Sequence, residues 1–291
     1  MQNTNTKSSN SEVLSYSQVI IEPSSGWVSL QLRAVWRYRE LLYFLVWRDI
    51  KVRYKQTALG VGWVVLQPLV SMVIFSFLFG YLLEVPSGNV PYPIFVYTAL
   101  LPWNYFASSL NRSSTSLINS SQLITKVYFP RLVIPFSSVL SGLVDFAIGF
   151  IILVGLMAFF RISPTPGILL LPAFLLLAML TALGFGLWLS ALNVRFRDVN
   201  YLTPFLVQIW MYLTPVIYGS TLIPERYRFL LALNPMTGVV EGFRWALLGE
   251  YLADAQPPGT IFIISIAIAL VVLVSGLIFF RYTERTFADV I

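Results

Sequence analysis

The stretch that decides the fold is LVIPFSSVLSGLVDFAIGFIILVGLMAFF, residues 132–160, which contains a single charged side chain, Asp145. An α-helix rises about 1.5 Å per residue, so roughly 20 apolar residues match the hydrocarbon layer of a bilayer. A barrel strand needs only about ten residues, and lipid offers no partner to an unpaired backbone amide. The stretch therefore predicts a membrane-spanning helix.

Five further stretches share this apolar character and contain no acidic or basic side chain. They lie at about residues 61–83, 94–110, 168–192, 201–219 and 260–280. The sequence thus predicts an all-α, polytopic membrane protein with six transmembrane helices. Hydrophobic residues make up 57% of the chain and charged residues 11%, which excludes soluble enzymes. The chain has no Cys and no His, so disulfides, Cys/His zinc sites and imidazole acid-base chemistry are excluded as well.

Lys and Arg are distributed unequally between the two sides of these spans. If the amino terminus is inside, only Arg161, Arg226, Arg228 and Arg244 of the 19 basic residues fall outside. This bias predicts cytoplasmic amino and carboxyl termini. The net charge of +6 then reflects topology, and no nucleic-acid partner is expected. The first dozen residues are polar and lack the apolar core of a secretory signal, and residues 1–27 are predicted to form a disordered cytoplasmic tail.

Two segments have helical patterns but are unsuited to crossing the bilayer. Residues 28–55 mix apolar residues and arginines at helical spacing, which is typical of an amphipathic helix lying along the headgroups. Residues 227–233 and 236–250 are short apolar stretches on either side of Asn234-Pro235. They predict an external re-entrant helical hairpin between spans five and six, sheltered by protein or by a water-filled cavity. Residues 56–291 are thus expected to form one six-helix permease domain.

Polar residues inside the spans are the first candidates for function. A carboxylate at bilayer depth costs several kcal/mol unless it is paired, so Asp145 should face the interior of the bundle. It would either make a structural interhelical hydrogen bond or form a polar spot on a transport path. Pro102 and Asn104 indicate that the second span is kinked and either packs against protein or lines such a path.

The source of energy must lie outside this chain if transport uses ATP. No Lys follows a Gly, so a GxxxxGK[ST] phosphate loop is absent. A partner would therefore bind ATP. Two loops expected on the inner side, 119–135 and 193–200, carry charges that either contact such a partner or are simply solvated.

Five segments in chain order carry a family resemblance. They are WRDIKVRYKQTALGVGWVVLQPL (47–69), LITKVYFPRLVIP (123–135), NVRFRDV (193–199), LNPMTGVVEGFRWALLG (233–249) and FADVI (287–291). Together they resemble the membrane subunit of type 2 ABC exporters. More narrowly, they are similar to the polysaccharide-export permeases that move O-antigen, teichoic acid or capsule chains.

The resemblance implies a role for three groups of residues. The contact with the ATPase partner would be made by Arg48, Asp49, Arg53, Tyr54, Lys126, Tyr128, Phe129, Pro130 and Arg131, with Arg195, Arg197 and Asp198 as a lesser contact. An aromatic-lined substrate path would draw on Tyr97, Trp103, Tyr105 and Phe106, beside the polar candidates Asn104 and Asp145. The re-entrant helices would supply an external gate with Asn234, Pro235, Glu241 and Arg244.

The resemblance further implies a half-transporter in the bacterial inner membrane. Two copies of the chain, with two ATPase subunits that bind ATP and Mg, would export a lipid-linked polysaccharide, and the chain itself would hold no cofactor, metal or catalytic residue. Three alternatives stay open at this point: a type 2 exporter of drugs or lipids, an ion-coupled secondary transporter using Asp145, and a membrane-embedded glycosyl or acyl transferase. For the transferase, the candidate acids are Glu84, Glu225, Glu241 and Glu250.

Overall fold

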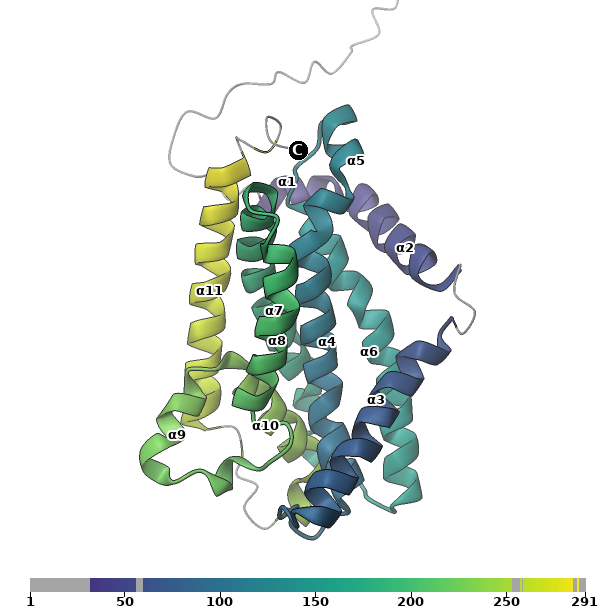
Figure 1. Cartoon of the computed structure of the whole chain (residues 1–291), viewed down its shortest axis with the longest axis vertical. Helices are drawn as coiled ribbons and strands as arrows, with labels where there is room; N and C mark the ends of the chain where they lie inside the picture. Colours follow the sequence, from purple (N-terminus) through teal and green to yellow (C-terminus); the bar gives the residue numbers. More distant parts are fainter. Residues whose placement is uncertain (1–31, 56–59, 253–256, 258, 285–286, 288–291) are drawn as a thin grey trace, which may run out of the picture.

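The computed structural model describes residues 32–55, 60–252, 257, 259–284 and 287, and these residues form helices and no strands. The long helices run side by side along the long axis of the molecule (Figure 1). Their bounds are α1 Leu32–Arg37, α2 Arg39–Lys55, α3 Gly62–Phe75 with a π-helical continuation Ser76–Leu82, α4 Tyr92–Asn119, α5 Ser121–Lys126, α6 Val133–Phe159, α7 Leu171–Arg195 after a 3-10 turn Pro166–Leu170, α8 Val199–Leu213, α9 Glu225–Ala232, α10 Pro235–Leu248 and α11 Thr260–Glu284. The predicted all-α class is confirmed.

Each of the six predicted apolar stretches contains an α-helix. Four of the described helices are long and apolar enough to cross a membrane: Gly62–Leu82, Val133–Phe159, Pro166–Arg195 and Thr260–Glu284. The other two expected spans differ from these for physical reasons. The 28-residue α4 contains polar side chains such as Asn104 and Arg112, and α8 has only 15 residues.

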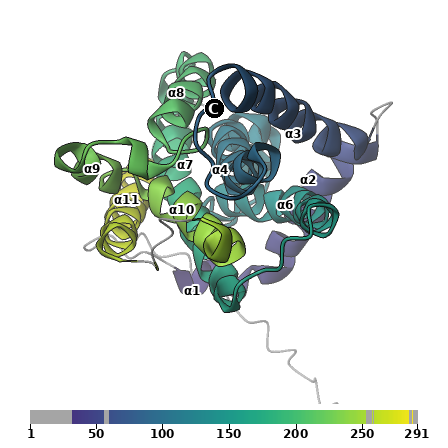
Figure 2. The ribbon, with the colours of Figure 1, turned by 90° about the horizontal axis from the view of Figure 1, so that it is seen from below.

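Helix α4 occupies the centre of the bundle. It contacts α3, α6, α7, α8 and α10, and the view along the bundle shows these helices around it (Figure 2). Close approach of two other helices depends on glycine. A Cβ atom at Gly184 of α7 would lie 2.8 Å from the backbone nitrogen of Leu273 in α11, and one at Gly276 would lie 2.5 Å from the Gly184 oxygen. Small residues let membrane helices pack backbone to backbone in this way.

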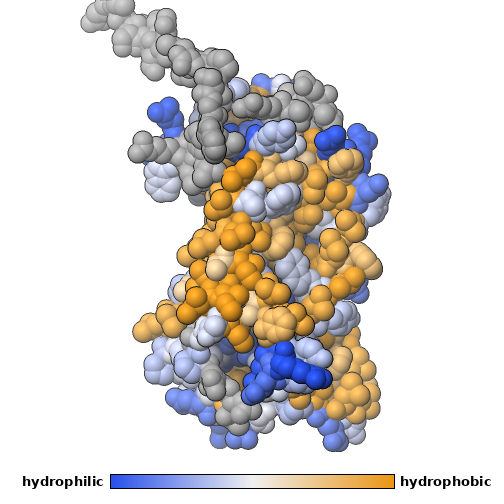
Figure 3. Space-filling view, turned by 90° about the vertical axis from the view of Figure 1, so that its left-hand side faces the viewer, coloured by the Kyte–Doolittle hydropathy of each residue, from blue (hydrophilic) through white to orange (hydrophobic). Residues whose placement is uncertain are grey.

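Large apolar side chains cover much of the outer surface. A band of hydrophobic residues separates two more polar ends on the face that includes α11 (Figure 3). Exposed members of such surfaces include Phe77 on the continuation of α3, Phe205 on α8 and Val271 on α11. A water-facing surface would not expose them so densely. The chain is therefore a multi-pass membrane protein.

The two ends of the bundle carry different elements. Helices α1, α2 and α5 and the connector 196–198 lie at one end, which we call the α2 end, and α9, α10 and the loop 83–91 lie toward the other, the α10 end (Figure 1). The predicted helix 28–55 is present as α1 and α2 from Leu32 onward. The predicted tail 1–27 lies outside the described residues, as does most of the quoted segment 287–291.

The predicted stretches 227–233 and 236–250 correspond to α9 and α10, which meet at Leu233 and Asn234. Most of α10 is buried in the bundle. The side chain of Asn234 caps α10 by accepting a hydrogen bond from the backbone amide of Met236 at 3.0 Å.

Candidate functional site

A charged cluster joins α2 to the bundle around Asp145. One carboxylate oxygen of Asp145 accepts hydrogen bonds from Arg53, which lies on α2, and from Arg112 on α4 at 3.3 Å. Its other oxygen accepts from the hydroxyl of Tyr54. Arg53 also donates to the Ser141 hydroxyl at 3.2 Å. The expected pairing of Asp145 inside the bundle is thus present, with partners from two other helices.

Helical periodicity explains why these residues meet. Ser137, Ser141 and Asp145 follow one another at four-residue spacing and therefore share one face of α6. Asp49 and Arg53 share one face of α2 for the same reason. Asp49 accepts a hydrogen bond from Ser137 at 3.4 Å, while Arg53 reaches Ser141 and Asp145. The two polar faces thus match along the length of the α2–α6 contact.

Gly142 makes room for the third partner of the cluster. A Cβ atom at this position would lie 2.5 Å from Nη2 of Arg112 and 2.6 Å from Oγ of Ser109. The guanidinium of Arg112 therefore passes over a bare stretch of α6 to reach Asp145. Its Nε is buried with no hydrogen-bond partner in the described part of the chain.

The cluster carries two guanidinium groups and one carboxylate, so its net charge is positive. Tyr54 adds a neutral donor: burial and the hydrogen bond to Asp145 raise the pKa of Tyr54 to about 12, which keeps its hydroxyl protonated near neutral pH. An arginine stays charged under all ordinary conditions. The cluster is therefore held together by charge-assisted hydrogen bonds, which are about twice as strong as neutral ones.

A cavity of about 420 Å³ opens beside the cluster between α2, α3, α4 and α6. Arg53, Tyr54, Arg112 and Asp145 line one part of it. The rest of the wall includes Trp63, Gln67, Asn104, Tyr105, Ser108 and Phe146. A concave site that combines aromatic faces with a few convergent polar groups is typical of ligand-binding cavities.

The structure separates the predicted path residues into two groups. Asn104, Tyr105 and Asp145 line the cavity. Tyr97, Trp103 and Phe106 are not among its lining residues and are buried in the core. The Trp103 ring lies 5.4 Å from that of Phe106, which in turn lies 5.0 Å from Trp210 on α8.

The predicted ATPase contacts also divide. Arg53 and Tyr54 point inward to Asp145, Phe129 is buried, and Pro130 is half-buried. Arg48 is partly exposed and pairs with Asp49 at 2.8 Å. The exposed members at the α2 end are Lys126, Tyr128, Arg195, Arg197 and Asp198.

Arg131 binds another part of the chain. Its guanidinium donates to the main-chain oxygen of Glu284, and its own backbone amide lies 3.3 Å from a carboxylate oxygen of Glu284. The guanidinium also lies 5.9 Å from the ring centre of Phe287. Arg131 therefore connects the loop before α6 to the end of α11.

The predicted external gate residues Asn234 and Arg244 anchor the start and the body of α10. Asn234 accepts a hydrogen bond from the Trp210 indole at 2.9 Å and donates to Thr214 at 2.8 Å, and Pro235 is the first residue of the helix.

Arg244 is 2% exposed and donates to the main-chain oxygens of Pro215, Val216 and Tyr218 at 2.6, 2.6 and 3.0 Å. It stacks 3.9 Å from the ring centre of Phe95. Glu241 lies 3.5 Å from this guanidinium. Arg244 therefore holds the turn that follows α8 against α10.

Sequence reasoning did not single out three residues that complete these sites. Arg112 donates a hydrogen bond to Asp145, and Ser141 accepts one from Arg53. Trp210 donates to Asn234. Only Arg112 offered a signal, because it is a charged residue in the polar sequence that follows the second apolar stretch. Its pairing with Asp145 required the packing of α4 on α6.

Comparison with known proteins is consistent with this architecture. Residues 40–248 match the family described as ABC-2 type transporter. The chain is 33% identical over 229 residues to an O-antigen export system permease protein of Myxococcus xanthus, covering 78% of this chain and 87% of that protein. It is 30% identical over 258 residues to one from Klebsiella pneumoniae, covering 87% and 95%. It is also 26% identical over 240 residues to the polysialic acid transport protein KpsM of Escherichia coli, covering 82% and 91%.

Proposed function

Because the chain belongs to the ABC-2 type transporter family, we propose that it is the membrane permease subunit of an ATP-driven exporter of lipid-linked polysaccharide in the bacterial inner membrane. The names of its relatives support the substrate class, since they are permeases for O-antigen and transporters of polysialic acid. The chain would perform no catalysis of its own. Two ATPase subunits would bind ATP and Mg and supply the energy.

The proposed topology has six spans and both termini in the cytoplasm. Helices α4 and α8 would complete the set of spans, and α4 can hold polar residues because other helices surround it. The α2 end would then face the cytoplasm, where the basic residues concentrate. Helices α9 and α10 would form the external hairpin, with α10 sheltered by the protein around it.

The proposed contact with the ATPase lies at the α2 end. Lys126, Tyr128, Arg195, Arg197 and Asp198 are exposed there and free to meet a partner surface. Tyr128 retains 75% of its exposure, which is high for a large aromatic side chain and typical of residues at interfaces. The inward-facing Arg53 and Tyr54 would act differently, by passing the motion of α2 into the bundle.

The observation that carries this proposal is the attachment of α2 to Asp145. An ATPase that closes on ATP would push α2 as a rigid element, and small shifts at such a contact move packed helices as units. Because α2 is tied to α6 and α4 through one carboxylate, its displacement would reach the walls of the adjacent cavity. In the proposed topology, a polar headgroup and the first sugars would enter this cavity from the cytoplasmic leaflet.

A homodimer is the expected assembly. A path wide enough for a sugar chain fits more readily between two six-helix bundles than inside one, and two ATP sites match a two-fold axis. Exposed apolar faces on α3 and α8 are available for such a contact or for lipid.

Reconstitution tests the proposal directly. The full chain and its ATPase partner are placed in vesicles with a fluorescent lipid-linked oligosaccharide, and the outward movement of the sugar is measured with and without ATP. Export is expected with both subunits and ATP, and it should persist when the proton gradient is dissipated. Export by this chain alone, or export that follows the gradient and not ATP, would refute the proposal.

A further inference from the structure

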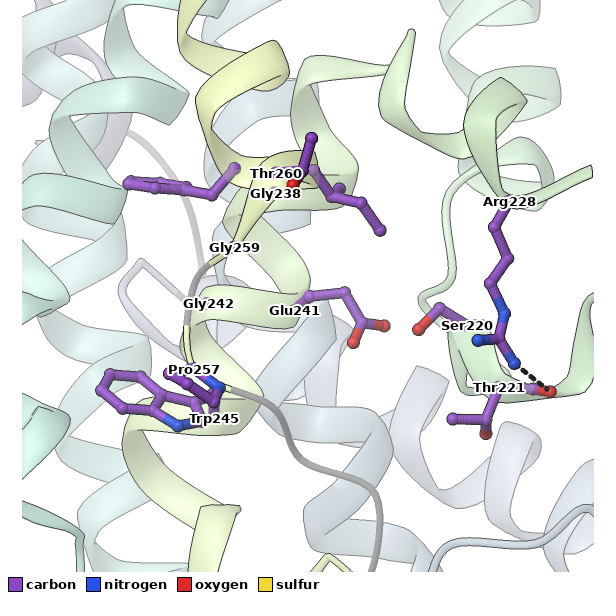
Figure 4. A pocket seen from close by; sticks show the side chains of 12 residues that line it. Ser220, Thr221, Arg228, Gly238, Glu241, Gly242, Trp245, Pro257, Gly259 and Thr260 are labelled. Atoms are coloured by element: carbon purple, nitrogen blue, oxygen red, sulfur yellow. Dashed lines mark hydrogen bonds between the residues drawn. The ribbon is translucent and has the colours of Figure 1, made fainter. Parts of the chain in front are cut away.

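A second cavity lies at the α10 end, and the coupling proposed above does not use it. Its volume is about 500 Å³. It is bordered by Ser220, Thr221 and Arg228, by α10, and by Pro257, Gly259 and the start of α11 (Figure 4). Polar and aromatic side chains line it. They include Ser220, Thr221, Arg228, Glu241, Trp245 and Phe262.

Opposite charges face this cavity from opposite walls. Glu241 projects into it from α10, and Arg228 projects into it from α9 on the far side (Figure 4). The main chain orients Arg228, because its Nε donates to the Ile223 oxygen at 3.1 Å and its Nη2 to the Thr221 oxygen at 3.4 Å. The Arg228 side chain is 38% exposed, so its guanidinium can still donate hydrogen bonds to a ligand.

Glu241 has unused hydrogen-bonding capacity. Its Oε1 is buried against Arg244 and accepts no hydrogen bond within the described residues, while the side chain as a whole is 33% exposed. The cation beside it is Arg244 at 3.5 Å, whose guanidinium donates to three main-chain oxygens. The other acid in the neighbourhood, Glu225, lies 3.9 Å from Arg228 and is 90% exposed, so solvent screens it strongly. The cavity therefore offers one partly exposed acceptor and one partly exposed donor.

The helices that border the cavity carry exposed apolar side chains. Phe229 and Leu233 on the α9 side are 63% and 59% exposed, and Ile263 on α11 is 67% exposed. On the face that includes α11, the hydrophobic band meets a polar region toward the α10 end (Figure 3). These helices thus offer an apolar surface beside the cavity.

We propose that this cavity binds the headgroup of a zwitterionic phospholipid that carries a phosphate and a primary ammonium. Arg228 would donate to the phosphate, and Glu241 would accept from the ammonium. The acyl chains would lie against exposed apolar side chains of α9 and α11, such as Phe229 and Ile263. A saccharide could use the same polar groups, but it would leave those apolar side chains uncovered. The proposal does not depend on which substrate the protein exports.

Native mass spectrometry of the full chain with its ATPase partner tests the proposal. The complex is titrated separately with phosphatidylethanolamine, phosphatidylcholine and phosphatidylglycerol of identical acyl chains. Retention of phosphatidylethanolamine is expected to exceed that of the other two about tenfold, because only its headgroup can donate N–H hydrogen bonds to Glu241. Glu241→Gln should abolish this preference. Arg228→Gln should weaken all three lipids, and Arg228→Lys should restore most of the binding.

Glu250→Gln is the matched control, because Glu250 is an exposed acid of the same end that does not line the cavity. Its lipid preference should equal that of the unmodified chain. Since Glu241 also contacts Arg244, each variant is first checked for unchanged thermal stability, and the Arg228 pair decides the outcome if Glu241→Gln is unstable. Equal retention of the three lipids would overturn the proposal, as would displacement of phosphatidylethanolamine by maltose.

Discussion

Replacing Asp145 by Asn tests whether the cluster holds α2 to the bundle. The change keeps the size of the side chain and removes its charge, so Arg53 and Arg112 lose their shared counter-ion. Removing one partner of a buried ion pair costs roughly 3 to 5 kcal/mol. The side chains of Asp145, Arg53 and Arg112 are 16, 21 and 27% exposed, which favours the lower end of that range. We therefore expect a loss of about 3 kcal/mol, equivalent to about two orders of magnitude in the folding equilibrium.

The assay compares purified variants in detergent. The fraction of monodisperse protein is measured by size-exclusion chromatography after heating, with Asp198→Asn as the control because Asp198 is an exposed acid at the same end. Asp145→Asn should unfold at a clearly lower temperature than the control. Arg53→Gln should cost less in the Asp145→Asn background than in the unmodified chain, because it then removes an unpaired charge.

Two results would refute this reasoning. One is an Asp145→Asn variant as stable as Asp198→Asn, which would mean that the ion pairs contribute nothing. The other is full additivity of Arg53→Gln and Asp145→Asn, which would mean that the two residues act independently.

Three further variants test other parts of the structure. Arg244→Gln should cost about 3 kcal/mol and yield less folded protein on immunoblots than the exposed control Arg226→Gln, because three main-chain oxygens lose a buried donor. Lys126→Ala should leave stability unchanged but lower export per ATP hydrolysed in vesicles; normal coupling would argue against the assigned ATPase contact. Trp103→Ala should lower the free energy of unfolding by roughly 3 to 5 kcal/mol, as is typical of a buried aromatic residue, and so reduce the amount of folded permease. A stable Trp103→Ala variant that exported shorter chains would instead place Trp103 on the substrate path.

The helices could be predicted because the bilayer imposes a simple rule on sequence. Residues 132–160 contain enough consecutive apolar side chains to identify α6 without any knowledge of its neighbours. The division of the segment between α8 and α11 into α9 and α10 was equally accessible, because Asn234-Pro235 combines a capping side chain with a proline at the first helical position.

The partners of Asp145 were less accessible, because they depend on tertiary packing. Arg53 lies 92 residues before it in the chain, and no local pattern connects the two. Arg53 also sits among other basic residues of α2, so only the packing of α2 on α6 distinguishes it from Lys51, which is exposed. The extent of α4 was underestimated for a related reason. Its last turns, up to Asn119, are stabilised by neighbouring helices such as α7. The side chain of Asn193 on α7 donates a hydrogen bond to the main-chain oxygen of Ser114 in α4.

The central position of α4 has a practical consequence for following the transport cycle. Since α3, α6, α7, α8 and α10 all rest on it, α4 supplies a common frame against which their displacements can be compared. The sequence contains no cysteine, so every cysteine introduced for a spin label is unique. A label at the exposed Asn119, paired in turn with labels on the outer helices, would convert one cycle of ATP hydrolysis into a set of distances measured from a single origin.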